Sequence, residues 1–170
     1  MIVAPLPDSR ASADDLVFRA ATAADAPQLA FWNQQLIEDE GHDNTMSRDQ
    51  LEARMRTWLT TEYQALIFEE PTTPPSAPAA YALFRDAPEW IHLRQFFVAR
   101  DRRRRGIGAR AVALLRDTVF PPDKPVIVEA MAWNHAALSF WRAVGFADRY
   151  VGLESRPRAS TQRSSRSVPP

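Results

Sequence analysis

The sequence contains no cysteine, which excludes disulfide bonds, thiol catalysis and zinc sites built on cysteine. It has three histidines without a His-x-x-x-His spacing, so we expect no metal site. No apolar run approaches the roughly 18 residues that a membrane-spanning helix needs. The start of the chain also lacks the basic and apolar regions of a secretion signal. We therefore expect a cytoplasmic protein that does not associate with membranes.

Lysine is almost absent as well, because Lys124 is the single lysine and every other basic residue is arginine. Basic and acidic residues each total 21, so the formal net charge is zero. The chain has 170 residues, of which 45% are apolar, and this size and composition are typical of one globular domain.

Both ends of the sequence lack hydrophobic periodicity and are predicted to be disordered. These segments are residues 1–14 and residues 155–170, and the second has four arginines and no acidic residue. A basic arm for nucleic acid, acting with Arg102–Arg105, is an alternative that we do not favour, so we expect no nucleic-acid partner. The folded domain is predicted to cover residues 15–154.

Within this domain the hydrophobic spacing predicts the order β-α-α-β-β-β-α-β-α-β, without an internal repeat. The predicted strands cover residues 16–19, 63–68, 79–84, 91–98, 126–131 and 150–153. Helices are predicted at about residues 22–37, 47–59, 106–118 and 134–145. The first two begin at capping boxes, Thr22–Asp25 and Ser47–Gln50. Antiparallel central strands followed by a β-α-β crossover indicate an α/β (α+β) fold with a mixed, mostly antiparallel sheet flanked by helices.

The most specific local pattern follows the strand at residues 91–98. Five arginines lie within residues 100–105, and Gly106-Ile107-Gly108 then opens a helix. Glycines, free helix N-terminal amides and arginines together suit a pyrophosphate. A Walker loop is excluded because no lysine follows the glycines, and a dinucleotide fingerprint is excluded because Ala111 replaces its third glycine.

Two motifs resemble those of the GNAT-type N-acetyltransferases. Residues 103–108 are similar to the acyl-CoA loop of that family, written Gln/Arg-x-x-Gly-x-Gly/Ala. The second motif is similar to Asn-x-x-Ala-x-x-Phe-Tyr-x-x-x-Gly-Phe, and its counterparts here are Asn134, Ala137, Phe140, Trp141, Gly145 and Phe146. The predicted order of elements agrees too, so the resemblance covers residues 16–153 and implies the GNAT fold, with acetyl-CoA as co-substrate.

The resemblance also implies a set of coenzyme A contacts. Backbone groups of Phe97 and Val98 would pair with the pantetheine arm. Asn134 would contact the same arm, although a plain helix cap explains this residue equally well. Arg105 would meet the 3′-phosphate. The pyrophosphate would be held by the rest of the loop, namely Arg103, Arg104, Gly106, Ile107, Gly108 and Ala109.

Attack of an amine on a thioester needs a base that works near neutral pH. The family often has a glutamate six positions before Val98, and this position is His92, whose ordinary pKa of about 6.5 suits the task. The alternative is a partly exposed strand histidine without a catalytic role. Trp141 stands where many members have a tyrosine acid, and an indole N–H is a poor acid. Tyr150 is a substitute candidate.

Acceptor specificity in this family depends on the first two helices and the loop between them. Residues 38–43 contain four acidic residues and no fixed cation, a pattern that favours a cationic amine and disfavours an acidic one. A solvated helix end is the alternative. We expect Glu38, Glu40 and Trp133 to contact the acceptor, with Trp32, Trp58 and Trp90 either beside them or in the core.

The sequence therefore predicts an enzyme that transfers an acetyl group from acetyl-CoA to a primary amine of a small molecule or a protein. An alternative from another class is a catalytically weak GNAT-like module that binds acyl-CoA as a sensor or an interaction partner. Homodimers are common in the family, so the resemblance also leaves a homodimer open.

Overall fold

The computed structural model describes residues 16–71 and 77–155. The segments predicted to be disordered, 1–14 and 155–170, lie outside the described residues except for Ser155. The strands are β1 (Val17–Ala20), β2 (Gln64–Glu70), β3 (Ala77–Asp86), β4 (Ile91–Val98) and β5 (Val126–Val128). The helices are α1 (Ala26–Glu40), α2 (Arg48–Thr60), α3 (Ile107–Leu114) and α4 (His135–Ala143). Shorter helical turns are η1 (Ala23–Asp25), η2 (Arg100–Arg102) and the π-helical η3 (Leu115–Val119).

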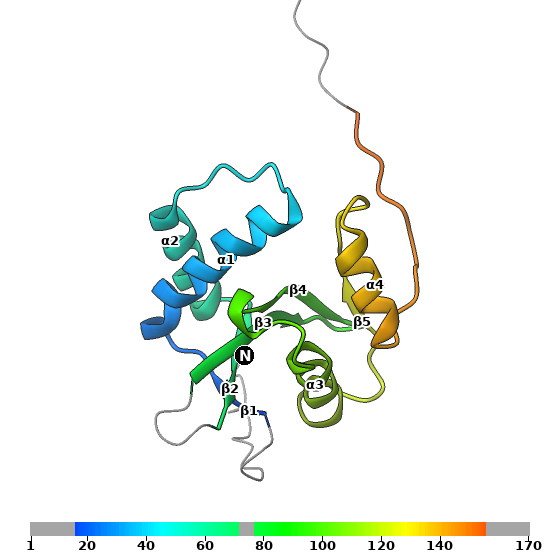
Figure 1. The fold of residues 1–170 in the computed structure, drawn as a ribbon, viewed down its shortest axis with the longest axis horizontal. Helices are drawn as coiled ribbons and strands as arrows, with labels where there is room; N and C mark the ends of the chain where they lie inside the picture. The colour runs from blue at the N-terminus through cyan, green and yellow to red at the C-terminus, as the bar shows by residue number, and fades with distance from the viewer. Residues whose placement is uncertain (1–15, 72–76, 156–170) are drawn as a thin grey trace, which may run out of the picture.

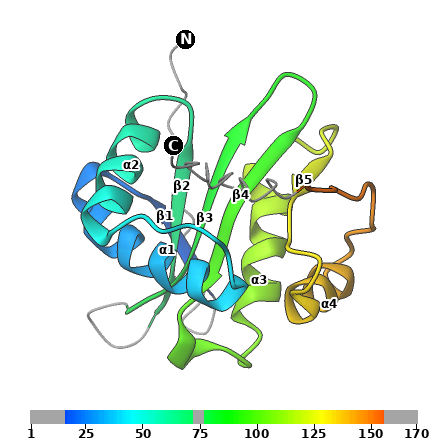
Figure 2. The ribbon, with the colours of Figure 1, turned by 90° about the horizontal axis from the view of Figure 1, so that it is seen from above.

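The strands form one sheet in the order β1-β2-β3-β4-β5. Every neighbouring pair is antiparallel except β4 and β5, which are parallel. Helices α1 and α2 cover one face of this sheet, α3 covers the other, and α4 lies beside β5 (Figures 1 and 2). The mixed, mostly antiparallel sheet with flanking helices confirms the predicted fold class.

The first two helical segments begin where the capping boxes predicted. Thr22 accepts a hydrogen bond from the amide of Ala24, while Asp25 accepts one from the amide of Thr22 at 2.7 Å. Ser47 and Gln50 exchange the equivalent pair at the start of α2. Arg19 on β1 adds an ion pair with Asp25 at 2.8 Å, which ties the first strand to the first helical turn.

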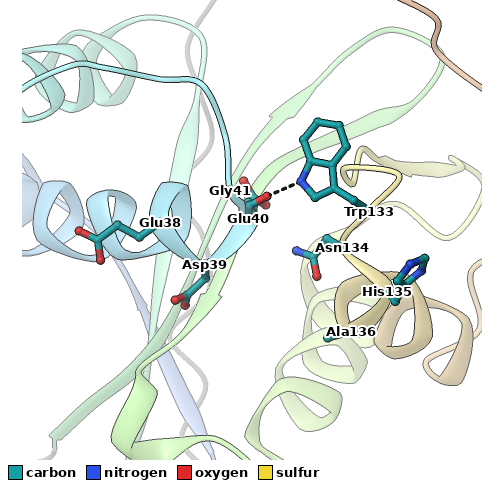
Figure 3. Close-up of a pocket in the computed structure, with 8 residues that line it drawn as sticks. All are labelled: Glu38, Asp39, Glu40, Gly41, Trp133, Asn134, His135 and Ala136. Carbon is teal, nitrogen blue, oxygen red and sulfur yellow. Dashed lines mark hydrogen bonds between the residues drawn. The ribbon is translucent and has the colours of Figure 1, made fainter.

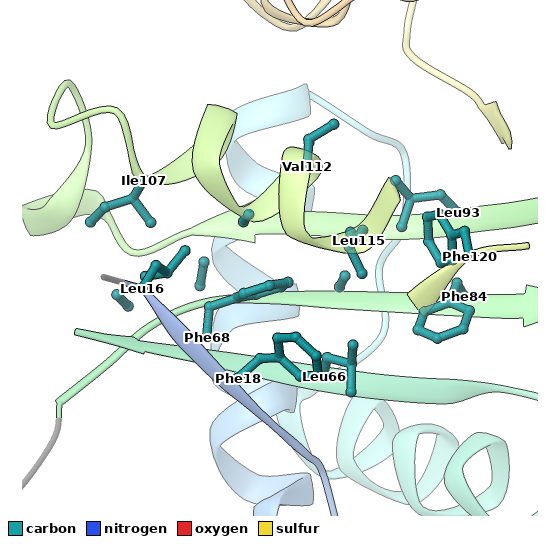
Figure 4. Close-up of a cluster of buried hydrophobic side chains, with 14 of the residues drawn as sticks. Leu16, Phe18, Leu66, Phe68, Phe84, Leu93, Ile107, Val112, Leu115 and Phe120 are labelled. Atoms are coloured by element: carbon teal, nitrogen blue, oxygen red, sulfur yellow. The ribbon is translucent and has the colours of Figure 1, made fainter. Parts of the chain in front are cut away.

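Two apolar cores lie on the two faces of the sheet. On the face of α1 and α2, Trp32 stacks on Tyr81 with ring centroids 5.9 Å apart, and Phe97 packs against both rings. On the other face, side chains of β1 and β2 such as Phe18 and Phe68 face Val112 and Leu115 from the α3 segment (Figure 4). Both faces of the central strands are thus buried, which fixes the backbone of β4 in place.

Strands β4 and β5 stay together over only part of β4. Their register runs from Ile91 opposite Val126 to Leu93 opposite Val128. Beyond Val128 the chain turns, because the carbonyl of Met131 accepts a hydrogen bond from the amide of Asn134 at 2.8 Å. The prediction of a strand up to Met131 is therefore wrong, and residues 94–98 of β4 have no strand beside them on this side.

A β-bulge interrupts β4 at the same point. Leu83 of β3 lies opposite Gln95, whereas the next residue, Phe84, lies opposite Leu93, so Arg94 has no partner in the register. Such a bulge bends a strand and redirects its side chains, and bulges are frequent next to active sites.

One further predicted strand is absent, and one predicted helix changes its type along its length. Residues 150–153 form no strand, and Val151 and Leu153 are 82% and 95% exposed. Four alternating residues interrupted by Gly152 bury too little apolar surface to extend the sheet beyond a three-residue edge strand. The helix predicted to continue to about Thr118 does extend this far, but its α-helical part ends at Leu114 and a π-helical turn follows to Val119, where the Phe120 amide donates to the Leu115 carbonyl.

Candidate functional site

The end of β4 presents backbone groups to the gap beside β5. The amide of Ala99 donates to Ala79 of β3 at 2.8 Å, so Ala99 faces β3. Successive residues of a strand direct their N–H and C=O groups to opposite sides, so those of Val98 face the gap and those of Phe97 face β3. The Phe97 ring is buried against α1. Of the two residues predicted to pair with pantetheine, only Val98 thus offers its own backbone groups.

Helix α3 begins without a side-chain cap. Gly106 holds the N-cap position at φ +75°, where a side chain would be strained, and a Cβ there would meet open space. Arg104 also has a positive φ of 65°. The first helical hydrogen bond runs from the amide of Arg110 to Gly106, so the amides of Ile107, Gly108 and Ala109 have no partner within the helix. Amides without a helical partner at a helix N-terminus are the arrangement that suits an anion.

Gly108 has a different reason to be glycine. A Cβ at this position would lie 3.1 Å from the ring of Phe140 on α4 and 3.5 Å from Val98. The second glycine of the motif therefore allows α3 to pack closely against α4 and β4.

The arginines of the loop form ion pairs across the site. Arg103 pairs with Asp39 at 2.5 Å and donates to the Val98 carbonyl at 2.9 Å. Arg100 pairs with Asp39 at 2.7 Å and with Glu38 at 2.9 Å. Carboxylates at the end of α1 thus hold the predicted phosphate-binding loop.

A second acidic residue holds the other side of this loop. Arg102 and Arg105 both pair with Glu70, at 2.9 Å and 3.1 Å. Arg104 forms no ion pair with any residue that the structure describes and is exposed to solvent.

The acidic segment at residues 38–43 is arranged differently from our expectation. Helix α1 continues to Glu40 and ends at Gly41, which is left-handed at φ +60°. Glu38 and Asp39 are therefore in the last helical turn, and the prediction that no cation accompanies them is wrong, because Arg100 and Arg103 do. Burial alone would raise the pKa of Asp39, but the hydrogen bonds from these two arginines lower it.

An open cleft of about 460 Å³ lies between the end of α1 and the segment that leads into α4 (Figure 3). The side chain of Trp133 connects the two sides of this cleft, because its indole N–H donates to the backbone carbonyl of Glu40 at 2.9 Å. Among the described residues, the Glu40 carboxylate has no hydrogen-bond or ion-pair partner, and burial raises its pKa. The cleft is lined by Glu38, Asp39, Glu40, Gly41, Trp133, Asn134, His135 and Ala136, so it brings together the three predicted acceptor residues and Asn134.

Asn134 is the N-cap of α4. Its side-chain oxygen accepts a hydrogen bond from the amide of Ala137 at 3.0 Å. This bond uses the oxygen and leaves the side-chain amide protons free to donate to a ligand carbonyl.

His92 lies opposite Ile127 in the short paired part of β4 and β5, one residue before the two strands separate. Its side chain is 15% exposed, and its Nε2 lies 3.8 Å from Oε2 of Glu129, the residue that follows β5. Burial lowers the pKa of His92 below the ordinary value of 6.5, and Arg94 and Arg85 add to this, while Glu129 opposes it. The imidazole is therefore neutral at pH 7 and able to accept a proton.

Of the two candidates for the acid that protonates the thiolate, Tyr150 lies at the site and Trp141 lies in the core. Tyr150 donates to Glu129 at 3.4 Å, and burial together with that carboxylate raises its pKa. Trp141 is 8% exposed and packs among Phe96, Phe140 and Phe146, so it belongs to the core.

The remaining tryptophans are equally dispersed. Trp32 is buried in the core beneath α1, and Trp90 lies in the turn between β3 and β4. Trp58 on α2 is half-buried, and the guanidinium groups of Arg54 and Arg94 both lie over its ring.

Two features of the site escaped the sequence analysis. Glu129 could have been found, because it directly follows a strand predicted to run parallel to the strand of His92. The association of Arg54 and Arg94 at Trp58 could not, since no local spacing relates residues of α2 to a bulge in β4.

Among the described residues, no group of three or more histidine or acidic side chains is arranged to hold a metal ion. None of the helices in residues 16–71 and 77–155 combines the length and hydropathy needed to cross a bilayer.

Several solved structures with the same fold are acetyltransferases. An acetyltransferase from Thermus thermophilus is 19% identical, with a TM-score of 0.63, and the match covers 81% of this chain and 88% of that one. The aminoglycoside N-acetyltransferase AAC(6′)-Iy, solved with the bisubstrate analogue CoA-S-monomethyl-acetylneamine, is 14% identical, with a TM-score of 0.64 and coverage of 86% and 100%. A ribosomal-protein-alanine N-acetyltransferase from Brucella melitensis is 12% identical, with a TM-score of 0.60 and coverage of 83% and 99%. At these identities the likeness establishes the fold.

Among curated proteins, none is significantly similar to this chain. The model of the acetyltransferase (GNAT) family matches residues 30–146, which include most of α1, the arginine and glycine loop and α4. This match confirms the resemblance carried by the two motifs. The chain therefore belongs to the GNAT acetyltransferase family.

Proposed function

We propose that this protein transfers the acetyl group of acetyl-CoA to an amine. The observation that carries the proposal is a continuous path for the co-substrate. The part of β4 that is not paired with β5 leads to the amides at the start of α3 that have no partner within the helix, and His92 lies one residue before β4 and β5 separate.

Three groups along this path suit coenzyme A. The backbone of Val98 can pair with the pantetheine amides as an added strand does. The side-chain amide of Asn134 can donate to a pantetheine carbonyl. The amides of residues 107–109 can hold the pyrophosphate, with Arg103, Arg104 and Arg105 supplying positive charge.

Binding of the co-substrate has to compete with contacts inside the protein. Arg103 already donates to the carbonyl of Val98 and pairs with Asp39. For Arg103 to meet a pyrophosphate and for Val98 to pair with pantetheine, the guanidinium group must leave that carbonyl. Arg104, which has no such partner among the described residues, can contact phosphate without this exchange.

The reaction itself requires one proton acceptor. The neutral amine attacks the thioester carbonyl carbon, a C–N bond forms, and the C–S bond breaks as the thiolate leaves. We assign the amine proton to His92, whose neutral form has a free ring nitrogen. Glu129 then stabilises the imidazolium that results.

We assign no protein acid to the departing thiolate. Trp141 is buried in an aromatic cluster, and the raised pKa of Tyr150 makes it a poor donor. Solvent is then the source of that proton. On the acceptor side, we assign Glu40 and Trp133 to contacts with the substrate, whereas Glu38 is engaged with Arg100.

Calorimetric titration with coenzyme A, followed by free-thiol release from acetyl-CoA with a panel of amines, tests the proposal. We expect binding and amine-dependent thiol release, and His92→Gln should lower the rate roughly 10²-fold with unchanged coenzyme A affinity. Binding without turnover on any amine would favour a non-catalytic acyl-CoA-binding module, and absence of binding would contradict the proposal altogether.

A further inference from the structure

Two arginines meet at one tryptophan on the acceptor side of the sheet. The guanidinium carbon of Arg54, on α2, lies 4.5 Å from the ring centroid of Trp58, and that of Arg94, at the bulge of β4, lies 5.0 Å from the same centroid. The bulge is what directs Arg94 toward α2, because it leaves this residue without a partner on β3.

Neither arginine has a carboxylate partner in the part of the chain that the structure describes. Arg54 donates from Nη2 to Asn33 at 2.8 Å, and Asn33 is neutral and 1% exposed. The Nε atom of Arg54 is buried without any hydrogen-bond partner. Arg94 contacts the rings of Trp58 and Tyr63 and forms no ion pair among the described residues.

Other arginines near the site have a carboxylate partner, unlike Arg54 and Arg94. Arg85, which also lies over Tyr63, pairs with Glu62 at 2.6 Å, and every arginine of the loop except Arg104 is paired with an acidic residue. The charge of Arg94 and burial both lower the pKa of Arg54, so the two cations disfavour each other in the absence of an anion. An oxyanion that accepts hydrogen bonds from both guanidinium groups would stabilise such a pair.

The site lies beside the base proposed above. His92 and Arg94 belong to the same strand face, and the Tyr63 ring contacts both, at 6.4 Å from His92 and 6.0 Å from Arg94. Two residues along a strand span roughly 7 Å, which corresponds to a few covalent bonds of a small molecule. An amine at His92 and an anion at the arginines can therefore belong to one small acceptor.

We propose that Arg54 and Arg94 form a subsite for a carboxylate of the acceptor, so that the preferred substrate is an amine that carries a carboxylate a few bonds from its nitrogen. This inference rests on the proposed acetyl transfer at His92. It replaces the expectation of a purely cationic acceptor, because Glu38 and Asp39 are neutralised by Arg100 and Arg103, which leaves Glu40 as the unpaired carboxylate of the cleft among the described residues.

The test compares acceptors that differ only in the carboxylate. Free-thiol release is measured with a panel of amino acids, their C-terminal amides and the corresponding decarboxylated amines. We expect kcat/KM for the best amino acid to exceed that for its amide and its amine by at least about 10-fold. Arg94→Gln, a change at an exposed side chain, is assayed at about pH 8, where His92 is neutral with or without the neighbouring charge. It should lower kcat/KM for the amino acid roughly 10- to 100-fold, through KM, while values for the amide change less than about twofold.

Arg56→Gln is the matched control, because Arg56 lies on the same helix and pairs with Glu52 at 2.7 Å. It should change none of these values. Preference for amides or decarboxylated amines, or an equal loss on all acceptors in Arg94→Gln, would overturn the subsite while leaving acetyl transfer intact.

If no acceptor of the panel is acetylated, the carboxylate subsite is tested by binding of the acetylated products. N-acetylated amino acids are then titrated into the complex with coenzyme A, with the N-acetylated amides as the comparison. Binding of the carboxylate forms that Arg94→Gln abolishes and Arg56→Gln retains would support the subsite. Equal binding of both forms, or none, would contradict it, and failure to bind coenzyme A itself would instead contradict the proposed function.

Discussion

At the scale of single residues, the surroundings of His92 decide its charge. Burial and the cations Arg85 and Arg94 favour the neutral imidazole, whereas Glu129 favours the protonated form. Because the balance lowers the pKa, the neutral form predominates at a lower pH than it does for a free histidine.

The pH profile tests this balance. If His92 is the base, kcat/KM rises with pH as the imidazole loses its proton, and the midpoint lies below 6.5. Glu129→Gln removes the one carboxylate that raises this pKa, so the acid limb should move to lower pH. The exposed Glu89→Gln is the control and should leave the limb in place. A limb that stays fixed or moves upward in Glu129→Gln would contradict the assignment.

Gly106 and Gly108 are glycines for different physical reasons: a left-handed backbone at Gly106 and close packing at Gly108. Gly106→Ala strains a left-handed residue and should cost about 1 kcal/mol of unfolding free energy. Gly108→Ala places a methyl group 3.1 Å from the Phe140 ring and should cost about 1–3 kcal/mol. Urea unfolding measures both.

A second substitution separates these two causes. Phe140→Leu should recover part of the loss in Gly108→Ala and none of the loss in Gly106→Ala. The same recovery in both double variants would show that contact with Phe140 is not what Gly108 avoids.

At the scale of elements, β1 is joined to the first helical turn by charge. The hydrogen bond from Arg19 lowers the pKa of Asp25 from 3.8 to about 2, with help from Thr22, although burial opposes the shift. Arg19 also pairs with Glu69 of β2 at 2.9 Å. This network connects three elements that are distant in the sequence.

The network predicts a specific loss of stability in acid. A carboxyl group with a lowered folded pKa stabilises the fold above its unfolded value, and the contribution is lost as the pH falls through the folded value. For Asp25 this window lies between about pH 4 and about pH 2. The unfolding free energy of Asp25→Asn should therefore fall less steeply than that of the parent protein across this window.

Asp148→Asn is the control for this measurement, since Asp148 pairs with Arg142 on the exposed surface. Its acid limb should follow that of the parent protein closely. Parallel limbs for Asp25→Asn and the parent protein would contradict the role of the network.

Element types were predictable wherever local signals were strong. The capping boxes gave the starts of the first two helical segments, and the apolar alternation gave the bounds of β4 exactly as they are observed. The end of α1 was not predictable, because acidic residues in a last turn oppose the helix dipole. That turn is stabilised by Arg100 and Arg103, which lie far along the chain.

At the scale of the whole molecule, the zero net charge includes opposite charges that lie in contact with each other. The sequence indicated a positive loop and a separate acidic segment, and the fold packs them against each other as ion pairs between residues 100–105 and the end of α1. The coenzyme A loop was predictable because its residues are contiguous. The acceptor side was not, since Arg54, Trp58 and Arg94 meet only through the packing of α2 on the sheet.

The central claim is that an acetyl group moves from coenzyme A to an amine nitrogen at His92. Mass spectrometry of the acceptor panel, incubated with acetyl-CoA labelled in its acetyl group, measures this directly. We predict label on the amine nitrogen with the parent protein and at least about 10²-fold less with His92→Gln at equal coenzyme A occupancy. Label transfer at the parent rate in His92→Gln, or none from the parent protein to any amine, would contradict the account.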